Sequence, residues 1–119
     1  MKSAKEILET SLNLFRDGEG WTTGDLCRIE KGPNKPEYCS LGAVFAASGF
    51  SPEDMDGIDY RSMLTEENRA AIYALAEEFE GHPPYDDEDA LRAVYENQDD
   101  MDDFSDIELT FYRAIGKLS

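Results

Sequence analysis

Two cysteines and a single histidine are the residues of this chain whose chemistry best suits nucleophilic catalysis. Cys39 precedes a predicted apolar helix, where the helix dipole lowers a thiol pKa, and a helix-start cysteine paired with histidine is typical of cysteine proteases. His82, however, lies in a Gly-His-Pro-Pro turn that we expect to face solvent, and the surrounding acids oppose thiolate formation. The sequence therefore favours a buried packing role for Cys39 and predicts no catalytic residue.

The two cysteines and the histidine also decide whether the sequence predicts a disulfide bond or a zinc site. Cys27 and Cys39 are 12 residues apart, a spacing that allows a bridge across a hairpin but is more typical of two free thiols in a reducing cytosol. Two cysteines and one histidine do not reach four zinc ligands in any usual spacing.

Segments rich in aspartate suggest calcium, but neither of them fits a known site. Residues 54–59 resemble part of an EF-hand loop, yet aligning Gly57 with the invariant glycine puts Pro52 at the first ligand and Met63 at the bidentate Glu. Residues 99–103 contain no glycine turn. Phosphate-binding loops and hydrolase motifs are also absent from the sequence. We therefore expect no specific metal site and no cofactor, only loose condensation of cations on these loops.

Acidic residues are concentrated in the second part of the chain. Residues 1–50 hold seven acids against six bases, whereas residues 51–119 hold 20 acids against five bases, so nearly all of the net charge of −16 lies there. Such a field repels nucleic acid, anionic membranes and free nucleotides, and it attracts basic protein surfaces, polyamines and divalent cations. We expect a basic protein surface as the partner, with no direct contact to nucleic acid or membrane.

The expected partner surface combines two acidic runs with nearby aromatic side chains that would anchor a basic protein. Its residues are Asp86, Asp87, Glu88, Asp89, Tyr95, Asp99, Asp100, Asp102, Asp103 and Phe104. A plainer interpretation is that the acids are solvated helix starts that keep the protein soluble, although their number exceeds what capping needs. Carboxylates on a rigid helical surface also imitate the phosphates of duplex DNA, so DNA mimicry is a narrower hypothesis.

Helical spacing of apolar residues predicts the elements that position these side chains. We expect helices at 3–17, 40–49, 65–80, 86–98 and 105–118, and a hairpin-like segment within 22–38. Ser3 with Glu6, Thr65 and Ser105 are the expected caps. The helix at 40–49 is polar on no face, so it should be central. The predicted fold class is all-α, with one domain of five to six short helices over residues 1–119.

The chain shows no sign of a membrane span or a secretory signal. No stretch approaches the roughly 18 apolar residues that a spanning helix needs, and the N-terminus lacks the apolar core of a signal peptide. We expect a cytoplasmic location. The sequence leaves open whether the protein is a monomer or a dimer.

Trp21 and the segment Tyr38-Cys39-Ser40-Leu41-Gly42-Ala43 give the chain a resemblance to a known family. They resemble the pattern of short, uncharacterised actinobacterial and actinophage proteins, in which a Trp precedes an aromatic-Cys-x-Leu-Gly-Ala helix start. Asn97-Gln98-Asp99 resembles an altered form of that family's Asn-Asp element, and Arg113-Ala114 matches its last pair. The resemblance implies no activity. It does imply a phage or prophage setting, hence the host cytoplasm and a role as an inhibitor of a host protein.

In terms of residue chemistry this motif is one of packing. Gly42 and Ala43 would let another helix approach closely, Cys39 would fill a small pocket, and Trp21 would cover the same core.

The sequence as a whole predicts a non-enzymatic domain that binds a basic host protein through its acidic C-terminal face, and a nucleic-acid-binding protein is one candidate for this partner. The alternative is a small-ligand-binding or hydrolytic domain with a pocket around Trp21, Tyr38 and Cys39, and a third possibility is an accessory protein whose acidity serves solubility. A deep pocket in which Cys39 and His82 converge would favour the alternative, whereas one contiguous acidic face without such a pocket would favour binding.

Overall fold

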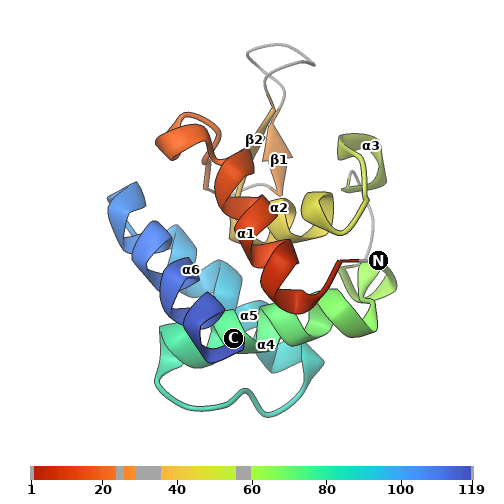
Figure 1. Cartoon of the computed structure of the whole chain (residues 1–119), viewed down its shortest axis with the longest axis vertical. Coiled ribbons are helices and arrows are strands. Elements are labelled where there is room, and N and C mark those ends of the chain that lie inside the picture. Colours follow the sequence, from red (N-terminus) through yellow and green to blue (C-terminus); the bar gives the residue numbers. More distant parts are fainter. Residues whose placement is uncertain (1, 24–25, 29–35, 56–59, 119) are drawn as a thin grey trace.

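The predicted helices form where the apolar spacing places them. The computed structural model describes residues 2–23, 26–28, 36–55 and 60–118 (Figure 1). Within these ranges it contains six α-helices, two 3-10 helices and one two-stranded antiparallel sheet. The elements are α1 (Ala4–Leu14), η1 (Arg16–Gly18), β1 (Cys27–Arg28), β2 (Glu37–Tyr38), α2 (Ser40–Ala47), α3 (Pro52–Met55), η2 (Tyr60–Met63), α4 (Glu66–Glu80), α5 (Asp87–Asp99) and α6 (Phe104–Leu118). The all-α prediction with a small hairpin is confirmed.

The helix ends differ from the prediction by up to three residues, and two of these differences have local reasons. α1 ends at Leu14, because Arg16 and Asp17 adopt left-handed backbone conformations with φ of 47° and 57° and turn the chain into η1. α6 begins at Phe104, because Asp103 caps it: the Asp103 carboxylate accepts a hydrogen bond from the Ser105 N–H at 3.2 Å. The expectation that Ser105 caps this helix is wrong by two residues.

Side-chain caps also define the starts of α1, α4 and α5. Ser3 and Glu6 form the predicted capping box of α1, and Thr65 forms a capping box with Asn68 at the start of α4. The Asp86 carboxylate accepts a hydrogen bond from the Asp89 N–H at 2.8 Å at the start of α5. Each cap satisfies backbone donors that a helix start leaves unpaired, which explains why these boundaries were predictable.

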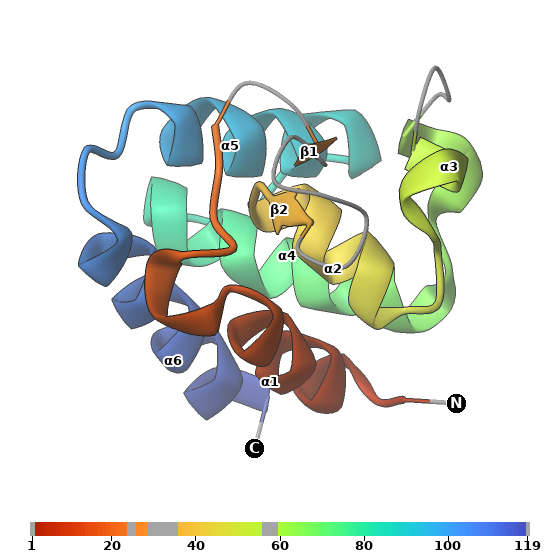
Figure 2. The same ribbon diagram turned by 90° about the horizontal axis from the view of Figure 1, so that it is seen from above.

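α4 is the helix around which the others assemble. It packs against α1, α5 and α6, and α1 also packs against α2 and α6. α5 and α6 lie on different sides of α4, so their solvent faces point in different directions (Figure 2). The Cα radius of gyration of 12.7 Å is that of one compact domain. None of the helices in the described ranges is both long enough and apolar enough to span a membrane.

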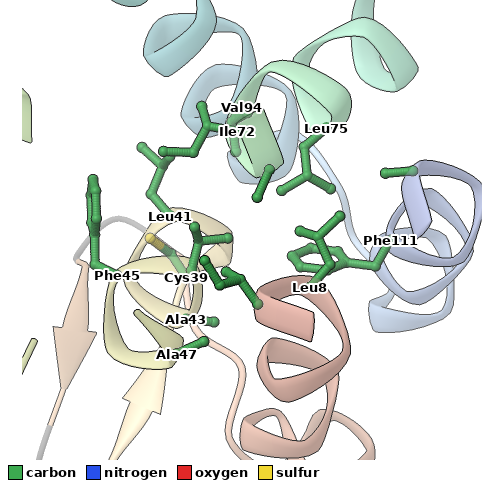
Figure 3. Packing of buried hydrophobic residues seen from close by; sticks show 14 of the residues in the cluster. Leu8, Cys39, Leu41, Ala43, Phe45, Ala47, Ile72, Leu75, Val94 and Phe111 are labelled. Atoms are coloured by element: carbon green, nitrogen blue, oxygen red, sulfur yellow. The ribbon is translucent and has the colours of Figure 1, made fainter. Parts of the chain in front are cut away.

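α2 is buried on nearly all sides, as its uniformly apolar sequence predicts. Residues 40–45 and Ala47 are buried. Figure 3 shows Ala43 and Ala47 directed at α1, and Leu8 of α1 beside Phe111 of α6. Because Ala43 and Ala47 are small, α1 packs directly against this side of α2. Ala43 therefore has the role predicted for it.

Candidate partner-binding site

A buried glutamine joins three segments that are far apart in the sequence. The Gln98 side chain, near the end of α5, is fully buried. Its Oε1 accepts hydrogen bonds from Trp21 Nε1 at 2.8 Å, from the Ser40 N–H at 3.2 Å and from the Ser40 hydroxyl at 3.3 Å. Its Nε2 donates to the neighbouring Asp99 carboxylate. These bonds tie the end of α5 to the start of α2, and we name Trp21, Ser40 and Gln98 the Gln98 cluster.

The start of α2 is shaped to hold Ser40 in this cluster. Cys39 is the N-cap of α2, and its Sγ accepts a hydrogen bond from the Gly42 N–H at 3.4 Å. The Cys39 N–H donates to the Leu26 carbonyl oxygen at 3.2 Å. A Cβ atom on Gly42 would lie 1.8 Å from that same oxygen. The prediction that Gly42 allows another helix to approach closely is therefore wrong. The absence of a side chain at Gly42 instead allows the backbone of Leu26 to approach α2 closely.

Tyr38 positions the tryptophan of the cluster. The Tyr38 N–H donates to the Gly20 carbonyl at 2.7 Å, and the Thr22 N–H donates to the Tyr38 carbonyl at 3.0 Å. Trp21 lies between Gly20 and Thr22, so both bonds hold it beside β2, from where its indole reaches Gln98. The motif predicted from the sequence is thus a set of packing residues that supports the cluster.

Trp21 also contacts the residue at which α6 begins. The Phe104 ring packs against Trp21 and Phe15, with ring centroids 5.9 and 5.4 Å away. Gly18 lies under the same ring, since a Cβ atom there would be 3.2 Å from it. Residues 99–103, between Gln98 and Phe104, are therefore anchored on Trp21 at both ends. We name residues 99–103 the acidic corner.

The acidic corner presents four exposed carboxylates on a stretch of sequence that contains no basic residue. Its exposed acids are Asp99, Asp100, Asp102 and Asp103. No Lys or Arg occurs in residues 93–112. Asp99 and Asp103 accept hydrogen bonds from Gln98 and from the Ser105 N–H, respectively, which orients their carboxylates. Asp100 and Asp102 make no ion pair or side-chain hydrogen bond with the described part of the chain.

Two acids at the start of α5, by contrast, form hydrogen bonds and ion pairs with other residues of the protein. Asp87 accepts a hydrogen bond from the Tyr73 hydroxyl at 2.7 Å and pairs with Arg69 at 3.1 Å. Asp89 accepts one from the Tyr85 N–H at 2.8 Å and pairs with Arg92 at 2.7 Å.

Arg92 is the centre of this paired region. Besides Asp89, it pairs with Glu80 at 3.0 Å and with Glu96 at 2.8 Å. Hydrogen bonds to these three carboxylates raise the Arg92 pKa. The pKa of Asp89 lies below its ordinary value, chiefly because of the Tyr85 N–H and next because of Arg92. The hydrogen bond to Asp87 raises the pKa of Tyr73 to about 12.

The aromatic residues near the acids differ in accessibility. Tyr95 is 38% exposed and lies one turn before Asp99, on the same side of α5. Phe104 is half-buried and packs inward against Trp21 and Phe15. Tyr95 is thus placed to contact a partner, whereas Phe104, predicted at the same surface, mainly supports the acidic corner from inside.

Cys39 and His82 do not converge. Cys39 is 4% exposed, and burial raises the pKa of its thiol to about 12 although the Gly42 and Leu41 N–H groups lower it. His82 is exposed in the connection between α4 and α5. This connection lies at the end of the molecule opposite the strands of the hairpin (Figure 1). A thiol with this pKa is protonated at neutral pH, so the geometry opposes the hydrolytic alternative.

Both cysteines are free thiols. β1 and β2 pair Cys27 with Tyr38. Because successive side chains of an extended chain point to opposite sides, Cys39 faces away from Cys27. The possibility of a bridge across the hairpin, open at the level of sequence, is settled in favour of free thiols.

A cavity of about 240 Å³ lies where α1, α2 and α4 meet, and its lining does not include the motif residues. It is lined by Lys2, Ile7, Ala47, Ser48, Gly49, Thr65 and Glu67. Among the described residues, no group of three or more His, Cys, Asp or Glu side chains is placed to hold a metal ion. Residues 56–59 of the EF-hand-like segment lie outside the described residues.

A family model matches residues 1–116, and its description is "Family of unknown function (DUF6197)". The chain belongs to this family. The predicted membership of an uncharacterised family is therefore confirmed, and the match spans both the Gln98 cluster and the acidic corner of this DUF6197 domain. Comparison with curated proteins and with solved structures gave no match.

Gln98 is the positioning residue that the sequence analysis missed. A signal for it exists, because Leu91, Val94 and Gln98 follow helical spacing and all three are buried. A polar residue that continues an apolar stripe usually belongs to a buried hydrogen-bond network. The pattern does not tell which distant donors that network includes.

Proposed function

We propose that this DUF6197 domain is a protein-binding domain that receives a basic protein surface on its acidic corner. The observation that carries the proposal is the anchoring of residues 99–103 on Trp21 at both ends, through Gln98 and Phe104. Neighbouring aspartates repel one another, and a segment that serves only solubility needs no such anchoring. An anionic segment that is already ordered loses less entropy when it binds.

The charge of the whole molecule supports the choice of partner. A net charge of −16 opposes binding to nucleic acid and attracts lysine- and arginine-rich surfaces. Tyr95, one turn from Asp99, adds an exposed aromatic contact beside the corner. The two free thiols suit a reducing cytosol, and we place the domain there.

A phage-encoded inhibitor of a host nucleic-acid-binding protein, with the acidic corner in the place of DNA phosphates, is a narrower form of this proposal. It requires that the partner bind the corner with the same basic surface that binds DNA. Duplex DNA added in excess should then displace the domain from its partner. If DNA and the domain bind the partner together, the narrower form is wrong and the broader one stands.

The experiment is affinity capture from a bacterial lysate with the immobilised domain at two salt concentrations. The test variant changes every acid of the corner to Asn, which keeps the hydrogen-bond acceptors and moves the net charge from −16 to −12. The control makes the same charge change at exposed positions elsewhere: Glu9, Glu19, Glu53 and Glu66→Gln. We expect a protein captured by the wild type and the control, lost with the test variant and weakened by salt. Equal capture by both variants would overturn the proposal.

A further inference from the structure

The solvent face of α6 carries two large apolar residues that the fold does not bury. Leu109 is 47% exposed and Tyr112 is 58% exposed. α6 already buries Ile107, Phe111 and Ala114 on its inward side. Leu109 and Tyr112 are three residues apart and so are neighbours on the helix surface. α6 lies at the edge of the molecule (Figures 1 and 2).

Small residues continue the row in both directions. Ser105, Leu109, Tyr112 and Gly116 follow the spacing of one helix face, and all four are exposed. A Cβ atom on Gly116 would meet nothing within 4 Å. Leu109 and Tyr112 therefore form the centre of this row, and the small residues Ser105 and Gly116 at its two ends allow a neighbouring helix to approach closely.

Opposite charges flank this row on one side. Asp106 and Arg113 are both exposed, one turn before and one turn after the centre of the row. Neither side chain has an ion-pair partner within the described ranges. They are seven residues apart, about 10 Å along the helix axis, so they do not pair with each other in one chain.

We propose that two copies of the chain associate through α6, packed antiparallel about a two-fold axis. In such a pair, each flank of a helix faces the same flank of its mate, so Asp106 of each copy faces Arg113 of the other. Leu109 then packs on Tyr112, and Ser105 lies opposite Gly116. A basic helix from another protein would meet Asp106 equally well but would face Arg113 with like charge. Charge complementarity on this face therefore favours a second copy.

The association should be weak and should not occupy the acidic corner. Two chains of −16 repel each other, although the Debye length of about 8 Å at physiological salt limits that repulsion. One helix pair buries less than a standard interface of about 1,200–2,000 Å², so we expect a dissociation constant in the micromolar range or weaker. The two acidic corners would lie at opposite ends of the helix pair, and the dimer stands independently of the proposed function.

Sedimentation equilibrium of the full chain over a wide concentration range tests this proposal. Asp106→Arg and Arg113→Asp should each raise the dissociation constant roughly tenfold, because each turns two symmetry-related attractions into repulsions. The double variant Asp106→Arg/Arg113→Asp should restore the wild-type value. Asp106→Arg distinguishes better between the specific charge pair and general repulsion between the two chains. It lowers the net negative charge, so it would strengthen the dimer if general repulsion alone limited the association.

Two further variants complete the design. Glu53→Arg makes the same charge change as Asp106→Arg on α3, on the other side of the molecule from α6 (Figures 1 and 2), and should not weaken the dimer. Leu109→Asp, at an exposed position that tolerates charge, should abolish it. A wild type that stays monomeric at every concentration, an undiminished dimer of Asp106→Arg, or a double variant without recovery would each overturn the proposal.

Discussion

Two acidic regions follow one another along the chain, residues 77–96 and the acidic corner. In the first, most carboxylates are paired with cations: Arg92 holds three of them, Arg69 holds Asp87, and Lys117 holds Glu77 and Glu78 at 3.2 and 3.0 Å. In the second, the contacts that fix the backbone come from the uncharged residues Gln98 and Phe104. In the first region most carboxylates are paired within the protein, whereas in the second the fold holds exposed carboxylates in place.

This difference implies different energetic consequences. Exposed ion pairs contribute little to stability, because water already solvates both charges and salt screens them. Buried hydrogen bonds and close backbone packing contribute much more when one partner is removed. Substitutions in the support of the acidic corner should therefore be far more destabilising than substitutions among the acids of either region.

Gly42→Ala should have the largest effect. The new Cβ would overlap the Leu26 carbonyl oxygen at 1.8 Å, so the backbone must shift and the Cys39–Leu26 hydrogen bond is lost. We expect a loss of about 3 kcal/mol or more in the free energy of unfolding, measured by urea denaturation. Gly116→Ala, in a helix with open space, is the control and should stabilise by about 0.5–1 kcal/mol. Similar values for the two variants would contradict the close packing of α2 on Leu26.

Gln98→Leu should have the next largest effect. It leaves the Trp21 indole and the Ser40 N–H without their acceptor in a buried site, at a cost of about 2–4 kcal/mol. Trp21 is the only tryptophan, so its fluorescence reports the local change directly. The control is Asn97→Ala, which removes a half-buried side chain that donates to the Ala93 carbonyl within α5, and should cost under about 1 kcal/mol. A Gln98→Leu protein as stable as the wild type would show that the cluster does not support the fold.

Asp89→Asn tests the paired region and should have a smaller effect that depends on pH. The folded protein lowers the pKa of Asp89 below its ordinary 3.8, so the ionised carboxylate stabilises the fold above that pH. The variant should be less stable than the wild type near neutral pH, and the difference should vanish as pH falls through the lowered pKa. Glu88→Gln, which removes a neighbouring acid without a described partner, should show no such pH dependence. A difference between wild type and Asp89→Asn that persists at low pH would contradict the role of ionisation.

Changing Asp99, Asp100, Asp102 and Asp103 to Asn should have the smallest effect on stability. Asn keeps the acceptor that bonds Gln98 and the cap that bonds the Ser105 N–H. Relief of like-charge repulsion should stabilise the protein slightly, within about 0.5 kcal/mol. Calorimetric unfolding measures this, and a clear loss of stability would show that the corner's charge serves the fold.

Local chemistry explains which parts of the structure were predictable from the sequence. The helices and the caps at Ser3 and Thr65 depend on residues within a few positions, so apolar spacing and capping patterns locate them. The close approach of Leu26 to Gly42 and the bond between Trp21 and Gln98 join residues that are 16 and 77 positions apart. Residue type shows that Gly42 and Gln98 are unusual for their surroundings, but only the three-dimensional arrangement names their partners. The inward contacts of Phe104 were not predictable for the same reason, because Phe15 and Trp21 are also far away in the sequence.

The most direct test of the contrast between the two acidic regions is a titration of the isotopically labelled domain with a short oligolysine peptide, followed by amide NMR. We predict that the largest shifts occur at residues 99–103 and at the Trp21 indole N–H, which is bonded to Gln98. Asp87 and Asp89 should shift little, because their carboxylates are engaged by Arg69, Arg92 and Tyr73. The shifts should disappear at high salt and in the variant with Asn throughout the corner. Shifts that are largest at residues 86–89, or that spread evenly over all exposed acids, would contradict a dedicated role for the acidic corner.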